Sequence, residues 1–316
     1  MMQRVIYEAY GSPDALKIQQ TEIPEPSDDE VLVKVMAAGV NPVDFKLRNG
    51  SMRFISPAKF PRVPGGEIAG IVEKAGKNAG KFKAGEKVFA MLPMAGGGYS
   101  SYLTVKENLL AQMPDNMSFR QGAAIPLAGL TALQCLRDKA GIKAGDEVLI
   151  NGGSGGVGMF AILIAKACGA SVTAVCSGRN LEFVKELGAH NTINYQTEKF
   201  TESTAKFDIV FDAVAKSNYS SAKKILTPAG IFVSTVPSPS LMFRQMINPL
   251  TRKKAFGILT RPGGKDLAYL ATLFSQGKLT PNIEKVYTLE NANLAHEHIE
   301  SERVRGKIVI VMPHSQ

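Results

Sequence analysis

The sequence predicts an α/β protein of two domains, one built on a doubly wound parallel sheet and the other rich in β-strands. The first observation is the length of 316 residues, which suffices for about two domains of roughly 150 residues each. The second is that short β segments dominate the first third of the chain, whereas strands and helices alternate in its middle part. The third is a glycine-rich loop, NGGSGGVG at residues 151–158, between a strand and a helix of that middle part.

The first predicted domain comprises residues 1–122 and consists mainly of short strands. Val and Ile are frequent in its segments VLVKVMAAGV, EIAGIVEKAG, EKVFAML and YSSYLTVKE, which Gly, Pro and Asn separate. The last part of the chain, residues 263–316, contains one helix in GKDLAYLATLFSQ and ends in the strand GKIVIVM. Because this part is too short to fold alone, we expect it to pack onto the first domain and complete it.

The second predicted domain comprises residues 123–262 and alternates strands with helices. Strands are expected in DEVLI, SVTAVC, FDIVFDAV and GIFVST, and helices in GVGMFAILIAKACG, NLEFVKELG and SNYSSAKKIL. Such alternation is typical of βαβ units, which require a parallel sheet.

The glycine-rich loop follows the strand DEVLI directly and precedes a helix. It matches the pattern G-x-G-x-x-G at Gly153, Ser154, Gly155, Gly156, Val157 and Gly158. In this pattern the first glycine allows a tight turn, the second lets the backbone approach a pyrophosphate, and the third lets helix and strand pack closely. The N–H groups and the dipole of the helix then attract the pyrophosphate charge. The loop therefore predicts a dinucleotide site; the alternative is a tight turn without a ligand.

The residues after the strand SVTAVC predict which dinucleotide is bound. NAD sites place an Asp or Glu about 20 residues downstream of the loop, where it binds the ribose 2′-hydroxyl. Here the strand leads into Ser177 and Arg179, and no acidic residue occurs before Glu182. A charge-assisted hydrogen bond from Arg179 to a 2′-phosphate would favour NADP over NAD by about tenfold to a hundredfold. The alternative is that Arg179 is an ordinary surface arginine.

Composition and charge limit the classes of protein. With 45% hydrophobic and 21% charged residues, the chain resembles a soluble globular protein and not a disordered or fibrous one. Its longest apolar run, residues 159–165, is far shorter than the ~20 residues that cross a bilayer. The N-terminal residues lack the pattern of a signal peptide, so we expect a cytoplasmic protein.

The net charge of +9 involves no long block of cations, so an anionic small molecule is expected as partner and nucleic acid is not. The chain has three cysteines, Cys135, Cys168 and Cys176. Their spacing does not match that of metal ligands, and we expect them to be reduced.

Several motifs in this order resemble those of a known superfamily. A β-rich domain followed by GLTAL, NGGSGGVG, CSGRN and a returning GKIVIV is similar to the medium-chain dehydrogenase/reductase superfamily over essentially the whole chain. Within it, GVNPVDFKLRNG, FPRVPGGEIAGIV and PLAGLTAL resemble the zinc-independent quinone oxidoreductase branch, including the chloroplast-envelope-type homologues.

The resemblance implies a GroES-like first domain, a Rossmann second domain and NADP(H) as the cofactor. It implies that Thr131 lies beside the nicotinamide half, that residues 154–157 contact the pyrophosphate, and that Gly306 and Lys307 belong to a segment that closes on the cofactor. Around the adenosine phosphate it places Ser177, Arg179, Asn180 and Tyr195. Proteins of this branch are usually homodimers that pair through their Rossmann sheets, so we expect residues 253–259, KKAFGIL, to form the edge strand of a homodimer.

Zinc is not expected in this chain. The alcohol-oxidising relatives hold catalytic zinc through a cysteine and a histidine, at positions where this chain has Asn41 and Gly66. Neither residue can replace a thiolate or an imidazole as a ligand. His296 and His298, two residues apart in a predicted helix, point to different faces, and we expect both on the solvated surface of that helix.

Without a Lewis acid, a quinone or an α,β-unsaturated carbonyl is the most suitable substrate, because the charge left by hydride addition is spread over several atoms. We expect Asn41 to donate a hydrogen bond to the substrate oxygen. Lys46 is expected to hold that oxygen or to contact the cofactor ribose and phosphate, and Asp44 to orient its neighbours. The alternative is that all three are ordinary polar residues of a turn. The proton donor is left open, and solvent can serve.

Two further alternatives remain open at this point. The segment SPSLMFRQMINPLTRKKAF, residues 238–256, mixes apolar residues with cations and is interpreted as a substrate lid, a weak peripheral membrane contact, or a dimer-contact or surface loop. The chain itself is a zinc-free quinone or enone reductase in the leading hypothesis. The alternatives are a zinc-free alcohol or carbonyl dehydrogenase and an NADPH-binding protein with little turnover.

Overall fold

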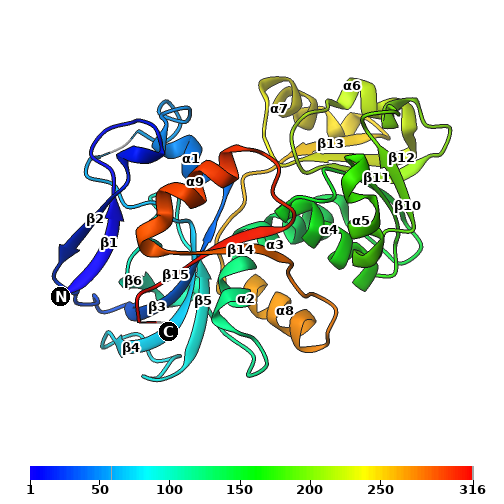
Figure 1. Ribbon diagram of the computed structural model, residues 1–316. Coiled ribbons are helices and arrows are strands. Elements are labelled where there is room, and N and C mark those ends of the chain that lie inside the picture. Colours follow the sequence, from blue (N-terminus) through cyan, green and yellow to red (C-terminus); the bar gives the residue numbers. More distant parts are fainter. Residues whose placement is uncertain (58, 315–316) are drawn as a thin grey trace. The chain divides into compact units, whose positions relative to one another are not determined.

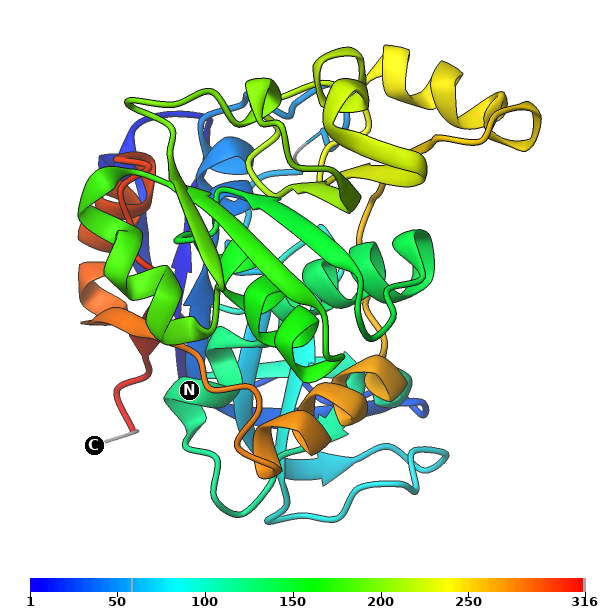
Figure 2. The same ribbon diagram turned by 90° about the vertical axis from the view of Figure 1, so that its right-hand side faces the viewer.

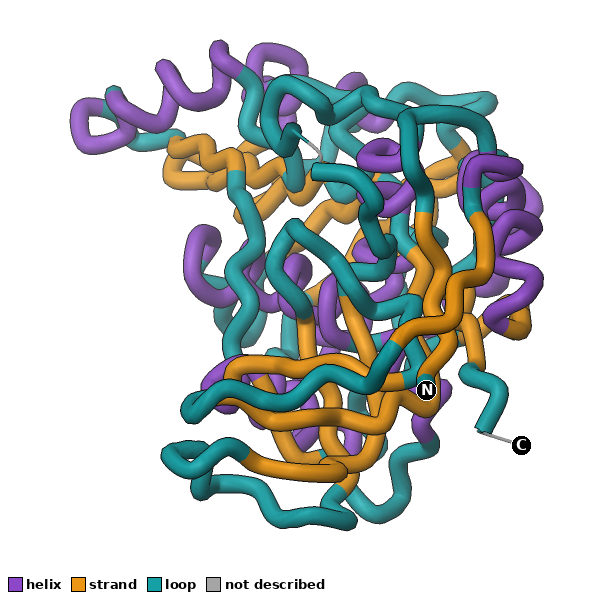
Figure 3. The backbone as a smooth tube through the Cα atoms, turned by 90° about the vertical axis from the view of Figure 1, so that its left-hand side faces the viewer, coloured by secondary structure: helices purple, strands orange, loops and turns teal. Residues whose placement is uncertain are grey.

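The computed structural model describes residues 1–57 and 59–314, which fold into two compact units (Figure 1). The first unit contains residues 1–127, residues 262–277 and the chain from Pro281 onward, and the second contains residues 128–261 and 278–280. Both ends of the chain thus belong to the first unit (Figure 3). Within the described residues, no helix combines the length and the apolar character that a membrane span requires.

The first unit is built on a mostly antiparallel sheet. Its strand order is β14-β15-β3-β4-β5-β7, and β6 also pairs with β3. The strands are β3 (Glu30–Val40), β4 (Glu67–Ala75), β5 (Lys87–Met91), β6 (Tyr102–Lys106), β7 (Leu110–Gln112), β14 (Ile283–Thr288) and β15 (Lys307–Val311). A separate two-stranded sheet contains β1 (Met2–Ile6) and β2 (Lys17–Thr21). The helices are α1 (Pro42–Arg48), α2 (Phe119–Ala124), α8 (Gly264–Ser275) and α9 (Ala292–Glu300).

The returning C-terminal segment completes this sheet. Strand β15, with the sequence KIVIV, is buried along nearly its whole length and pairs antiparallel with β3 and parallel with β14. Such a continuous apolar run is typical of a strand that is covered on both faces.

The second unit is a parallel sheet with the order β10-β9-β8-β11-β12-β13. Its strands are β8 (Glu147–Asn151), β9 (Ser171–Cys176), β10 (Asn191–Asn194), β11 (Phe207–Asp212), β12 (Leu226–Ser234) and β13 (Lys254–Gly257). The main connecting helices are α4 (Gly156–Ala167), α5 (Leu181–Leu187), α6 (Tyr219–Ala222) and α7 (Pro239–Met246), and Figure 2 shows α4 and α5 against the strands. This is the doubly wound order, so the predicted fold class is confirmed. The strand expected within residues 253–259 is β13, which ends the order of the sheet.

The boundary between the units lies after Leu127, in the first turn of α3 (Pro126–Leu133). The sequence analysis placed it after residue 122. Helix α2 packs against β3 and β4, and the Leu127 amide donates to the Glu67 carboxylate at 2.7 Å. These contacts assign the end of α2 to the first unit, which sequence alone could not show.

The segment 238–256 was treated as a loop, and this was wrong for most of it. Ser238 caps helix α7 by accepting a hydrogen bond from the Leu241 amide at 3.2 Å, and Pro239 occupies the first turn. Both features favour the start of a helix. A 3₁₀ turn, η7 (Asn248–Leu250), then leads into β13.

Candidate functional site

A buried polar cluster lies in the first unit, where three strands meet at one edge of the sheet. Strand β3 ends at Val40, and β4 and β15 begin at Glu67 and Lys307. Because β3 runs antiparallel to both neighbours, its end and their beginnings lie at the same edge. Asn41, the residue after β3, therefore lies between a carboxylate and an ammonium.

The cluster is tightly bonded. The Lys307 Nζ lies 2.7 Å from Glu67 Oε1 and 2.5 Å from Asn41 Oδ1. The Asn41 Nδ2 donates to Glu67 Oε1 at 2.7 Å. The exposed fractions are 2% for Asn41, 0% for Glu67 and 3% for Lys307, so each charge depends on its partners inside the protein.

Asn41 and Asp44 also form the N-terminal cap of α1. The Asn41 amide donates to Asp44 Oδ2 at 2.8 Å, in the capping-box arrangement of a helix start. Burial, reinforced by the nearby Glu67 charge, raises the pKa of Asp44 to about 7, although the Asn41 amide and Lys307 act in the opposite direction. Asp44 thus caps the start of α1, and its predicted role in orienting the site residues stays a prediction.

Lys46 does not join this cluster. It is exposed on α1, and its ammonium lies 6.0 Å from the centre of the Phe45 ring. The structure thus brings Asn41 and Asp44 together but leaves Lys46 on the solvent side, and its predicted substrate or cofactor contact stays a prediction. Lys307 was expected to close on the cofactor, but its side chain points to Asn41 and Glu67, and that role too stays a prediction. Gly306 before it has a φ of 78°, which favours glycine.

The prediction that His296 lies on a solvated helix surface was wrong. His296 is fully buried on α9, and His298 is half-buried. The Nε of the buried Arg48 donates to His296 Nδ1 at 3.1 Å, and Arg48 also pairs with Glu300. Burial and the Arg48 charge lower the pKa of His296 to about 3. Sequence reasoning missed this link between α1 and α9 because its partners are more than two hundred residues apart.

The glycine-rich loop in the second unit has the geometry of a dinucleotide site. Helix α4 begins at Gly156, directly after the loop. A Cβ on Gly158 would overlap the Gly152 carbonyl oxygen, so this glycine allows the helix to pack on the strand. A Cβ on Gly155 would meet no atom closer than 3.6 Å. The surface beside Gly155 is therefore open for a ligand, while Gly158 is required by the fold.

A second set of predicted residues gathers beside this loop. The buried Asn180 donates from Nδ2 to Ser154 Oγ at 3.0 Å and to Ser177 Oγ at 3.2 Å. The amide of Tyr195 donates to the Cys176 carbonyl at 3.1 Å, next to Ser177. Arg179 is exposed at the same end of β9. The structure thus joins the pyrophosphate loop to the residues expected around the adenosine phosphate.

Thr131 lies elsewhere in the second unit. It is buried on α3, and its hydroxyl lies 2.8 Å from that of Thr260, which follows β13. Its predicted contact with nicotinamide stays a prediction.

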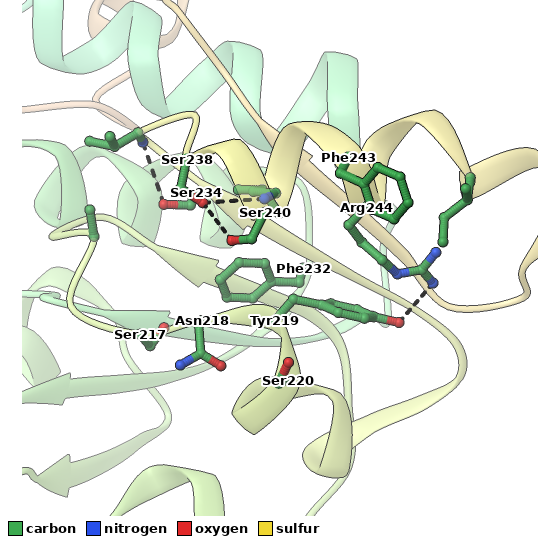
Figure 4. Close-up of a pocket in the computed structure, with 14 residues that line it drawn as sticks. Ser217, Asn218, Tyr219, Ser220, Phe232, Ser234, Ser238, Ser240, Phe243 and Arg244 are labelled. Atoms are coloured by element: carbon green, nitrogen blue, oxygen red, sulfur yellow. Dashed lines mark hydrogen bonds between the residues drawn. The ribbon is translucent and has the colours of Figure 1, made fainter.

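The second unit also contains a cavity of about 280 Å³ beside α7 (Figure 4). The Arg244 Nη2 forms part of its wall and donates to the Tyr219 hydroxyl at 2.9 Å. Asp212 fixes the turn that forms another side, because its carboxylate accepts from the Ser217 hydroxyl and amide, both at 2.7 Å. Hydroxyl and aromatic side chains share the lining, including Ser234, Ser238, Ser240, Phe232 and Phe243.

The residues present do not fit a zinc ion. Within residues 1–57 and 59–314, no group of three His, Cys, Asp or Glu side chains is arranged to hold a metal. The oxygen of Asn41 lies against the Lys307 ammonium, which would repel a dication. The cysteines are free thiols, and burial raises the pKa of Cys176 to about 11, so this thiol is protonated at neutral pH.

The two units together define a dinucleotide-dependent dehydrogenase or reductase. Residues 27–115 match the family described as alcohol dehydrogenase GroES-like domain, and residues 187–310 match the family described as zinc-binding dehydrogenase. The chain is 36% identical to the chloroplastic quinone-oxidoreductase homolog of Spinacia oleracea, over 98% of both chains. It is 34% identical to the 2-methylene-furan-3-one reductase of Solanum lycopersicum, over 96% of this chain and 77% of that one.

A solved structure gives the same result. The Escherichia coli quinone oxidoreductase, complexed with NADPH, matches with a TM-score of 0.86 and 27% identity, over 98% of this chain and 99% of that one. The chain belongs to the quinone oxidoreductase branch of the medium-chain dehydrogenase/reductase superfamily. The resemblance noted in the sequence motifs is thereby confirmed.

Proposed function

We propose that this protein is an NADPH-dependent reductase of quinones or of the C=C bond of α,β-unsaturated carbonyls, and that it works without zinc. The observation that carries the proposal is the position of Asn41. Its amide is held between Lys307 and Glu67, where zinc-dependent members of the superfamily have a cysteine ligand. The names of the similar proteins support the same two substrate classes and the same cofactor.

The glycine-rich loop and the residues beside it suit NADPH. The first N–H groups of α4 lack partners within the helix and can bind the pyrophosphate. Ser177 and Arg179 can bind the 2′-phosphate, and Asn180 holds Ser177 in place. When bound, the cofactor supplies a hydride.

Conjugated substrates suit the polar groups of the first unit. Reduction of a quinone or enone leaves an anion spread over several atoms, which hydrogen bonds can stabilise. An amide nitrogen has two hydrogens, and Asn41 uses one toward Glu67. The second hydrogen would serve a substrate oxygen that reaches the small exposed part of Asn41, whose exposed fraction is 2%. A simple ketone or alcohol concentrates its charge on one oxygen and would need a stronger electrophile, which makes the alcohol dehydrogenase alternative less suitable.

The test is the loss of NADPH absorbance with a panel of acceptors. The panel contains 9,10-phenanthrenequinone, 1,4-benzoquinone, an alkyl vinyl ketone, a long-chain enone and a simple ketone. NADH in place of NADPH and added EDTA serve as controls. We expect turnover of a quinone or enone that persists in EDTA. Turnover abolished by EDTA and restored by zinc would overturn the zinc-free site, and tight NADPH binding without turnover would favour the non-catalytic alternative.

We also propose that the protein forms a homodimer through β13. The support is that β13 ends the strand order of the parallel sheet, and the end of a sheet is where a second chain can pair. The side chains of Asn248 and Gln245 bond to the outward backbone groups of Ala255 and Gly257, so pairing would replace these bonds. Light scattering after size-exclusion chromatography should give a mass of two chains, and a mass of one chain would overturn the dimer. A cytoplasmic location stays a prediction, to be checked by cell fractionation.

A further inference from the structure

The whole excess of positive charge in this chain lies in one segment. Between Asp212 and Asp266 there is no Asp or Glu, while the chain as a whole has 28 of them. The same stretch contains nine cations, which equals the net charge of +9. They are Lys216, Lys223, Lys224, Arg244, Arg252, Lys253, Lys254, Arg261 and Lys265. The cations form no long block, but the missing acidic residues give the segment a strong field of one sign.

Several of these cations lie close together in the second unit. The Lys253 Nζ donates to the carbonyl oxygens of Lys223 and Leu226, both at 2.8 Å. This brings the end of α6 next to the start of β13. The side chains of Lys223, Lys224, Arg252 and Lys254 are all exposed there.

Helix α7 and η7 present apolar side chains to solvent beside these cations. The exposed fractions are 58% for Met242, 67% for Phe243, 78% for Met246 and 86% for Leu250. On its other side, α7 packs on β13 and buries Leu241 to 5% exposure. Both side views show α7 and η7 standing out from the body of the second unit (Figures 2 and 3).

We propose that this face, formed by Met242, Met246 and Leu250 with the flanking cations Lys223, Lys224 and Arg252, docks on the surface of an anionic phospholipid bilayer. A projecting helix with apolar side chains and neighbouring cations is the arrangement that binds at a lipid–water interface. Anionic headgroups attract the cations, while the apolar side chains enter the boundary of the acyl chains. The inference is independent of the proposed reductase activity, because it rests on other residues.

Charge complementarity favours a bilayer over the other occupants of this face. A second copy seated on this face, and not paired along β13 as proposed above, would bring Lys223, Lys224 and Arg252 of both copies together, and juxtaposed like charges disfavour a complex. Nucleic acid would match the charge, but its interfaces are polar and highly hydrated. Exposed Met and Leu side chains would gain little there.

The experiment is co-sedimentation of the full-length protein with vesicles. Vesicles of phosphatidylcholine alone are compared with vesicles that also contain phosphatidylserine, at low and high salt. We expect binding only with phosphatidylserine and at least about tenfold weaker binding at high salt, because salt screens the headgroup charges. The variants Met242→Ser/Met246→Ser/Leu250→Ser and Lys224→Gln/Arg252→Gln should each weaken binding about tenfold or more.

Matched controls change the same chemistry elsewhere on the surface. Ile18→Ser/Leu294→Ser removes half-exposed apolar side chains, and Lys74→Gln/Lys77→Gln removes two exposed cations; both should bind vesicles like the wild type. The proposal is overturned by equal binding to both vesicles or by unchanged binding of the α7 variants. Binding to duplex DNA but not to vesicles would also overturn it. A change of oligomeric mass in the variant Met242→Ser/Met246→Ser/Leu250→Ser would overturn it as well, because the face would then belong to a contact with a second copy of the chain.

Discussion

The ammonium of Lys307 lies 2.7 Å from the carboxylate of Glu67, and the two side chains are 3% and 0% exposed. This pair connects the beginnings of β15 and β4, and thereby joins the returning C-terminal segment to the N-terminal part of the sheet. Asn41 completes it with one hydrogen bond to each partner. The site helix α1 begins directly after Asn41, so the pair also fixes where that helix starts.

Removal of one member of this pair should be strongly destabilising. In Lys307→Met the Glu67 carboxylate stays buried without its cation, so we expect the free energy of unfolding to fall by about 3–5 kcal/mol. Urea unfolding followed by circular dichroism measures this. The matched control is Lys74→Met, which breaks an exposed pair with Glu25 and should change stability by less than about 1 kcal/mol. Equal effects of the two variants would show that the buried pair contributes nothing beyond a surface one.

Asp44 should make the protein less stable as the pH rises. Its pKa is about 7 in the folded protein and about 4 in an unfolded chain. Between these values the folded state holds a proton that the unfolded state has lost, so the free energy of unfolding decreases with increasing pH and levels off above about pH 7. In Asp44→Asn this contribution is absent. The stability of the wild type relative to this variant should therefore fall between about pH 4 and about pH 7; a constant difference would contradict the raised pKa.

His296 should have the opposite effect. Its pKa is about 3 when folded and about 6.5 when unfolded. Below about pH 6.5 the unfolded chain gains a proton that the folded protein does not accept, so stability is lost as the pH falls. In His296→Asn, the carbonyl oxygen of the new side chain can still accept from Arg48. The free energy of unfolding of this variant should therefore decrease less than that of the wild type between about pH 7 and about pH 5, by about 1.4 kcal/mol per pH unit. Melting temperatures across this range, with His190→Asn as the control for a partly exposed histidine, provide the measurement.

The local patterns were sufficient to predict the parallel sheet and the glycine-rich loop between a strand and a helix, because both depend on residues close in sequence, whereas the edge strand was inferred from the family resemblance. The cap formed by Asn41 and Asp44 was not predicted, since these residues were interpreted as site residues or as polar residues of a turn. The partners of Asn41 were not predicted either, since Glu67 and Lys307 reach it only through strand pairing over long separations. One signal was available: Glu67 and Lys307 each begin an apolar strand, where a buried charge requires a partner of opposite sign. His296 was misplaced because the face that α9 turns toward Arg48 depends on tertiary packing.

Arg179 should determine the preference for NADPH over NADH. Its guanidinium is expected to bind the 2′-phosphate that only NADPH has, so Arg179→Ala should raise the KM for NADPH by about tenfold to a hundredfold. The KM for NADH should not change. Arg137→Ala, which alters another exposed arginine of the second unit paired with Asp138, is the control. Similar increases for both cofactors would mean that Arg179 acts through the fold and not through the phosphate.

The two glycines at the start of α4 should separate cofactor binding from folding. A methyl group on Gly158 would overlap the Gly152 carbonyl, whereas one on Gly155 would stay 3.6 Å from that same atom. Gly155 has a φ of −81°, which alanine adopts without strain. Gly155→Ala should therefore keep its melting temperature but bind NADPH at least about tenfold more weakly, because the methyl group occupies the space that a pyrophosphate needs.

Gly158→Ala should instead lose stability before any ligand is added, by about 1–3 kcal/mol, because the backbone must move to remove the overlap. Thermal unfolding and fluorescence titration with NADPH, performed on both variants, distinguish the two effects. If Gly155→Ala binds NADPH like the wild type, the open surface beside the loop is not where the cofactor binds. The proposed reductase would then need its dinucleotide site elsewhere in the second unit.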